Sequence, residues 1–98
     1  MDVKLIKMLS GEDVVAELVE IKGRDSIVIS NPIIMVPQQD GQVGMAPWSP
    51  FKDQNVKELE VSRNYVAYIT EPISSLVENY KQIFSPIITP GGAGKIIT

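Results

Sequence analysis

The chain contains no cysteine and no histidine. Without cysteine there are no disulfides, no thiolate metal sites and no cysteine-based catalysis, and a reducing, cytoplasmic setting suits such a chain. Without histidine as well, neither an ordinary zinc site nor a histidine-based catalytic triad can be built. No nucleophile and base stand out as a pair among the remaining residue types. We therefore predict that the protein is not an enzyme and uses no metal or cofactor.

A long apolar run is also missing, as is an excess of positive charge. No segment approaches the roughly 20 apolar residues of a membrane span, and the N-terminus lacks a basic segment followed by an apolar one. We expect a soluble, cytoplasmic protein that does not associate with a membrane. The net charge of −3 weighs against nucleic acid, because neutralising phosphates supplies most non-specific affinity.

What the chain does have is the pattern of one small, mostly-β domain. Its 98 residues correspond to a single domain, and the hydrophobic fraction of 44% is ordinary for a folded protein. Apolar and polar residues alternate in short segments separated by Gly-, Asn- and Ser-containing turns. Between the third and fourth segments, residues 37–56 are rich in Gln, Gly and Pro and are predicted to form a loop or loose hairpin. We predict five strands, over residues 3–9, 13–21, 26–36, 57–61 and 65–70.

One helix is predicted over residues 72–84. Its apolar residues fall on one stripe, which is typical of a helix that packs against a core or a subunit interface, and Pro72 suits the first turn. The stripe consists of Ile73, Leu76, Val77, Tyr80, Ile83 and Phe84. The domain is therefore assigned to residues 1–86, and residues 87–98 to a tail that we expect a neighbouring subunit to hold. The tail's glycines do not form a phosphate-binding loop, because Ile96 replaces the Ser or Thr of that motif.

Two segments of the chain resemble the motifs of the Sm-like protein family, which includes the Lsm and Hfq proteins. The segment 10–21 is similar to the first Sm motif, with Gly11 at the turn and Ala16 at the small position of a bent strand. The segment 61–69 is similar to the second motif, a strand, a short knuckle and another strand. The resemblance spans residues 3–70. The insert at 37–56 and the helix after the strands are most similar to the short Sm-like proteins of marine cyanobacterial phages.

The resemblance implies a five-stranded, strongly bent antiparallel sheet, a small Sm-like barrel, with a C-terminal helix. It also implies a homo-oligomeric ring of about five to seven copies, in which the fourth strand of one copy pairs with the fifth strand of the next. General physics agrees, because the free edges of an open sheet invite pairing and head-to-tail pairing can close into a ring. A phage protein of this kind would bind single-stranded RNA in the host cell cytoplasm.

The family's RNA-binding positions carry different residues in this chain. Aligned without gaps, the family's Asp falls on Lys22, its stacking residue on Asp25 and its Asn on Ser26, while its Arg-Gly pair falls on Ser62 and Arg63. An aspartate cannot stack on a base and would repel phosphate. We therefore carry over the location of the site and not its uridine chemistry. The candidate RNA-binding residues are Lys22, Arg24, Ser26, Ser62 and Arg63; the alternative is that they are ordinary solvated turn residues.

Trp48 and Phe51 form a second candidate site within the proline-containing segment 47–51. Exposed, they could stack on bases or anchor a protein partner. Alternatively, they cap the open end of the sheet as a small satellite core, because tryptophan is largely buried on average.

Two functions remain open from the sequence. The first is a ring that binds single-stranded RNA weakly, as the family resemblance implies. The second is a ring that serves as a structural or protein-interaction scaffold, which the acidic balance and the altered RNA positions favour.

Overall fold

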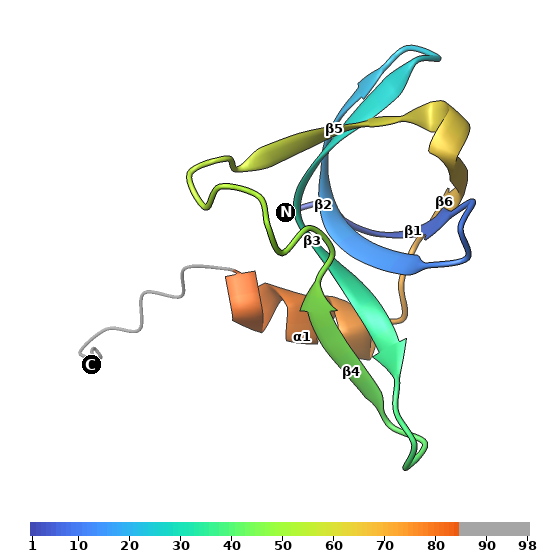
Figure 1. Ribbon diagram of the computed structural model, residues 1–98, viewed down its shortest axis with the longest axis vertical. Coiled ribbons are helices and arrows are strands. Elements are labelled where there is room, and N and C mark those ends of the chain that lie inside the picture. The colour runs from blue at the N-terminus through green and yellow to red at the C-terminus, as the bar shows by residue number, and fades with distance from the viewer. Residues whose placement is uncertain (85–98) are drawn as a thin grey trace.

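The computed structural model describes residues 1–84, which form six strands, a short 3₁₀ turn and one helix (Figure 1). This arrangement agrees with the predicted mostly-β class and C-terminal helix. The prediction of five strands was wrong by one, because the segment 37–56 contributes an additional strand. The elements are β1 (Val3–Met8), β2 (Asp13–Lys22), β3 (Ser26–Pro37), β4 (Val43–Pro47), β5 (Glu58–Ser62), η1 (Arg63–Tyr65), β6 (Val66–Thr70) and α1 (Ser74–Phe84).

The strands form one antiparallel sheet in the order β4-β3-β2-β1-β6, with β5 paired to β3 beside β4. The long strand β3 serves two partners on the same side: its first half pairs with β5 and its second half with β4. Figure 1 shows β5, β3, β2, β1 and β6 curling round a common axis, while the hairpin of β3 and β4 projects away from the curl. The curl is not closed as a barrel, since β5 and β6 do not pair within residues 1–84.

Irregular registers help the sheet to bend. The β2–β3 pairing shifts between Val15 and Glu17 and again between Leu18 and Glu20, and the β1–β6 pairing shifts at Lys7. An extra residue in one strand bends that strand and increases its local twist. Ala16, at the first shift, is fully buried, so a small side chain occupies the concave side of the bend as the sequence suggested.

The bent sheet buries apolar residues on both of its faces. Consecutive residues of a strand point to opposite faces, and both Val14 and Val15 are fully buried. The inner core, inside the curl, consists of Ile6, Met8, Val14, Ala16, Ile27, Ile29 and Val61. The outer core, between the sheet and α1, consists of Val3, Val15, Ile33 and Tyr80, with Leu5, Met35, Leu76, Val77 and Phe84 packed against it.

The helix packs on the convex side of the sheet, and only some residues of its predicted apolar stripe contact the sheet. It begins at Ser74, two residues after the predicted start, so Pro72 precedes the helix instead of lying in its first turn. Four stripe residues pack on the sheet, whereas Ile73 and Ile83 remain exposed. The hydroxyl of Tyr80 reaches the sheet itself, where it accepts a hydrogen bond from the Glu17 amide and lies 3.0 Å from the Ser30 carbonyl oxygen.

The hairpin of β3 and β4 agrees with the second of the two structures predicted for residues 37–56, a loop or a loose hairpin, and adds the strand β4. The chain turns at Gln38–Gly41, where Gly41 takes a positive φ of 82°, and returns along β3 with Met45 opposite Met35. The Asn31-Pro32 step marks the place where β3 changes partner from β5 to β4. Proline has no backbone N–H to donate. None is needed at Pro32, because the pairing with β5 ends at Ser30 and the pairing with β4 begins at Ile33. The predicted bend coincides with Asn31, whose φ is +51°.

Two strands of the curl have one unpaired edge each. β5 pairs only with β3 and β6 only with β1 among the described residues. β6 also exposes Tyr68, whose side chain is 51% accessible. An open edge next to an exposed aromatic residue is a typical place for another strand to add.

Candidate functional site

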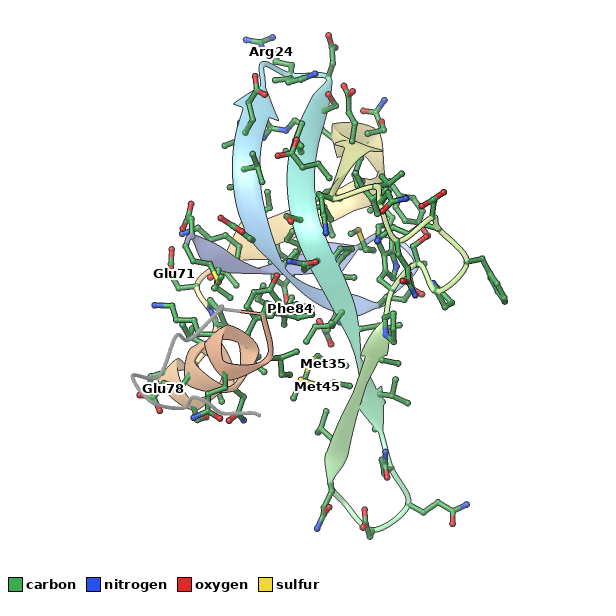
Figure 2. All side chains as sticks on the ribbon, turned by 90° about the vertical axis from the view of Figure 1, so that its left-hand side faces the viewer. Arg24, Met35, Met45, Glu71, Glu78 and Phe84 are labelled. Atoms are coloured by element: carbon green, nitrogen blue, oxygen red, sulfur yellow. The ribbon has the colours of Figure 1, made fainter. Side chains whose placement is uncertain are left out.

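The turn between β2 and β3 carries three of the predicted site residues. Gly23, at a φ of 60°, allows the tight reversal, and the Asp25 amide donates to the Lys22 carbonyl oxygen over 3.3 Å. The register of the hairpin places Lys22 opposite Ser26. Arg24 lies at the exposed tip, at one end of the molecule (Figure 2).

The knuckle between β5 and β6 carries the other two. Ser62 precedes η1, and its hydroxyl accepts a hydrogen bond from the Asn64 amide over 3.2 Å. This cap satisfies an amide that the short helical turn leaves unpaired. The knuckle then leads directly into β6, so the position of Arg63 is fixed by regular structure on both sides.

The structure brings the turn and the knuckle together. The Arg63 amide donates to the Asp25 carbonyl oxygen over 2.9 Å, and its guanidinium donates through Nη1 to the Gly23 carbonyl oxygen over 2.7 Å. In addition, Ser26 lies opposite Ser62 in the β3–β5 register. Residues 22–26 and 62–65 therefore form one continuous patch, which we name the turn–knuckle surface.

The carboxylate of Glu60, on β5, lies beside this surface. The Ser26 hydroxyl donates to Glu60 Oε2 over 2.6 Å, and Lys22 Nζ lies 3.6 Å from Glu60 Oε1. The Ser26 hydrogen bond and, next, the charge of Lys22 hold the pKa of Glu60 below its ordinary value. Ser26 is itself buried, so its hydroxyl is turned toward Glu60 and not toward solvent. Sequence reasoning missed Glu60, because an acidic residue on an alternating strand reads as a solvated side chain.

The free positive charge of the turn–knuckle surface is small. Arg24 has neither an ion pair nor a side-chain hydrogen bond within residues 1–84, whereas Lys22 faces Glu60 and Arg63 is partly engaged by a carbonyl oxygen. Asp25 adds a second carboxylate to the same patch. A surface of this kind suits weak, salt-sensitive contacts with phosphate and not a strong electrostatic footprint.

A small hollow of about 250 Å³ adjoins the knuckle. It is smaller than the roughly 300–1,000 Å³ of typical small-molecule sites. The hollow lies beside β6 and the start of β3, on the side where β5 and β6 do not pair within residues 1–84. The residues that line it are Ile27, Arg63, Val66, Ala67, Tyr68 and Ile69.

Trp48 and Phe51 do not form a joint exposed site. Trp48 is half-buried against the inner core, and its indole nitrogen donates to Glu12 Oε1 over 3.2 Å. This placement corresponds to the structural alternative, in which the tryptophan caps the core. Phe51, in contrast, is 98% exposed on the loop that follows β4.

Within residues 1–84, no group of three or more Asp and Glu residues could hold a metal ion. No helix in this part of the chain is long and apolar enough to cross a membrane. The glycine-containing segment 91–95 and the predicted tail lie outside the described residues.

No protein-family model matches the chain, and no curated protein matches it either. The interpretation of the site therefore rests on its own geometry and on the strand order.

Proposed function

We propose that the protein is an Sm-like module that assembles into a homo-oligomeric ring and presents the turn–knuckle surface to single-stranded RNA. The strand order carries this proposal. With the β3–β4 hairpin set aside, the order β6-β1-β2-β3-β5 leaves β5 and β6, the fourth and fifth predicted strands, at the two edges, where the resemblance expects the ring contact, and a short knuckle joins them as in the second motif. The unpaired edges of β5 and β6 are the two strands that the ring would join.

The RNA assignment is supported by the meeting of the turn and the knuckle. These two segments are separated in the sequence by more than thirty residues, and two hydrogen bonds of Arg63 fasten them together. Ring closure would repeat the patch once per subunit, so several weak contacts could add to a useful affinity. The phosphate contacts would come from Arg24 and Arg63, and Tyr65 of the knuckle, which is exposed, could stack on a base.

Fluorescence anisotropy with short labelled U-rich and A-rich RNAs, at low and moderate salt, tests the RNA function. We expect micromolar or weaker binding that falls with salt, and a severalfold loss of affinity in Arg24→Ala and in Arg63→Ala, with a shallower salt dependence. Lys81→Ala, an equal change of charge on α1, should bind like the unmodified protein. An affinity for RNA that is the same at both salt concentrations and in Arg24→Ala and Arg63→Ala would overturn the proposal.

A second function is favoured by the carboxylates at the patch. Because Glu60 engages Ser26 and Lys22, and Asp25 lies beside them, the ring could serve as a protein scaffold without any RNA. The same titration separates the two functions, since the scaffold predicts no binding even at low salt.

A further inference from the structure

The hairpin formed by the second half of β3 and by β4 projects from the curled sheet (Figure 1), and we name its residues 33–47 the arm. Only the base of the arm is tied to the core, where Ile33 and Met35 belong to or pack on the outer core. β4 pairs with β3 on one side, and its other edge has no partner within residues 1–84. Because a two-stranded ribbon is marginal alone, the arm is an incomplete sheet.

Hydrogen bonds at both ends of the arm fix which backbone groups of β4 point outward. At the tip, the Gln38 amide donates to the Gln42 carbonyl oxygen over 2.8 Å, and at the base the Trp48 amide donates to the Pro32 carbonyl oxygen over 3.0 Å. Bonded and non-bonded pairs alternate along an antiparallel ladder. The even-numbered residues of β4 therefore bond to β3, and the odd-numbered residues direct their N–H and C=O groups away from it.

This outward edge of β4 is suited to accept another strand. Val43 and Met45 each present an amide and a carbonyl oxygen there, while Pro47 presents a carbonyl oxygen only. Sheets usually protect such an edge with charged side chains or a bulge. β4 carries no charged residue, and its register with β3 has no shift. The side chains of Val43 and Met45 are exposed, so an added strand would also bury apolar surface.

Charge identifies a second copy of this chain as the partner. Between Asp25 and Lys52 the chain has a single charged residue, Asp40, which lies in the turn at the tip of the arm. Copies with a net charge of −3 repel one another elsewhere, and like charges that lie opposite each other across two strands destabilise the pair. Antiparallel pairing of two β4 strands brings no charges together, and it points the two tips in opposite directions, which keeps the Asp40 carboxylates apart.

We propose that β4 pairs antiparallel with β4 of a second copy, so that the two arms form one sheet in the order β3-β4-β4-β3. Met35 and Met45 lie opposite each other on the α1 side of the arm (Figure 2). Pairing continues this apolar face from one copy to the next. The joined arms thereby meet the requirement of three or more strands with an apolar face, which neither arm meets alone.

This contact is distinct from the proposed ring contact. It uses the same strand of both copies, so it joins two partners and then closes, whereas the contact between β5 and β6 runs head to tail. It requires neither the ring nor RNA, since it would join two rings or, without a ring, two single chains. Two five-residue strands make a small contact, so we expect the association at high micromolar concentration and not at low micromolar concentration.

Sedimentation equilibrium of the unmodified protein, from about 10 μM to about 500 μM, tests the pairing. The average mass should double over this range and rise no further. Met45→Lys, which places a charge on the free edge, should weaken this doubling at least about tenfold. Val36→Lys is the matched control, because Val36 has the same 39% exposure on the inner strand of the arm, and it should still double. A mass that does not double, that grows past the doubled value, or that responds equally to both substitutions would overturn the proposal.

Residue-resolved hydrogen exchange adds a readout that needs no substitution. The outward amides of Val43 and Met45 should exchange at least about threefold more slowly at the high concentration than at the low one, because pairing gives them acceptors. The Gly44 amide, which already bonds to β3, should change less. Exchange at Val43 and Met45 that is independent of concentration would contradict the pairing, whatever the state of the ring.

Discussion

At the scale of single residues, one hydroxyl group stabilises a register shift between β2 and β3. The Tyr80 hydroxyl accepts from the Glu17 amide over 3.1 Å and lies within 3.0 Å of the Ser30 and Asn31 carbonyl oxygens, where β2 and β3 lose their regular register. The helix thereby supplies hydrogen bonds that the sheet cannot make at this point. The sequence placed Tyr80 correctly on the apolar stripe, but its polar partners come from distant strands and leave no local signal.

Tyr80→Phe removes this hydroxyl and little else. It should leave buried backbone groups of β2 and β3 unsatisfied and lower the free energy of unfolding by about 1–3 kcal/mol. Urea denaturation measures the change. Tyr65→Phe, which removes a hydroxyl from an exposed side chain outside the β6 edge, should stay within about 0.5 kcal/mol of the unmodified protein. Equal effects of the two substitutions would refute the role assigned to Tyr80.

The same hydroxyl makes the stability depend on alkaline pH. Burial raises the pKa of Tyr80 to about 12, whereas an unfolded chain ionises its tyrosines near about 10. The folded state therefore holds this proton more tightly than the unfolded state. The contribution of the Tyr80 hydroxyl to the free energy of unfolding is fully present below about pH 10 and is lost as the pH rises toward about 12. The difference in unfolding free energy between the unmodified protein and Tyr80→Phe should shrink over this window. A difference in unfolding free energy that stays constant over this pH range would contradict the raised pKa of Tyr80.

Glu60 is predicted to restrain RNA binding. Glu60→Gln should release Lys22 and remove a negative charge beside the turn–knuckle surface, so that affinity for single-stranded RNA at low salt rises severalfold. Glu78→Gln, at an exposed position on α1 far from Arg24 (Figure 2), provides the matched loss of charge. If both substitutions raise the affinity equally, only the net charge matters and the patch is not the binding site.

At the scale of elements, the strands that were predicted are short segments rich in β-branched and other apolar residues between turn residues. β2 and the first half of β3 are such segments, and the apolar stripe predicted α1. For β4 the sequence predicts only a loop or loose hairpin, because Gly44 and Pro47 are poor strand formers and pairing with β3 makes this segment a strand. Pairing between segments is a tertiary effect, which local periodicity does not report.

The hairpin of β3 and β4 should be the least stable part of the sheet, since a two-stranded ribbon is marginal on its own. Gly41→Ala places a side chain at a φ of 82° and should weaken the turn by about 1–2 kcal/mol. Hydrogen exchange should then accelerate in β4 and remain unchanged in β1 and β2. Uniform acceleration through the whole sheet would show that the hairpin unfolds only together with the core.

At the scale of the whole molecule, the resemblance names the residues of the candidate site, and their role in binding stays a prediction. The two bonds from Arg63 to Asp25 and Gly23 show that the turn and the knuckle carrying these residues are in contact. The sequence could not reveal that Ser26 is buried against Glu60, since that contact depends on how β3 pairs with β5. It also allows two roles for Trp48, and it could not reveal that the indole packs against the inner core and donates to Glu12.

The proposed ring contact can be disrupted on β6 alone. Tyr68→Lys adds a charge on the edge strand that the next copy would cover, so it should shift the assembly toward smaller species. Ile83→Lys adds the same charge at a matched exposure, 54% against 51%, on α1. It should leave the assembly intact, as measured by size-exclusion chromatography with light scattering. Loss of assembly in the helix variant alone would assign the interface to α1.

Native mass spectrometry of the unmodified protein tests the central claim most directly. A ring joined through β5 and β6 predicts one closed species of about five to seven copies of the 10.8 kDa chain, with no open-ended series of larger oligomers. A single species at the mass of the monomer, over the micromolar range and above, would contradict the account.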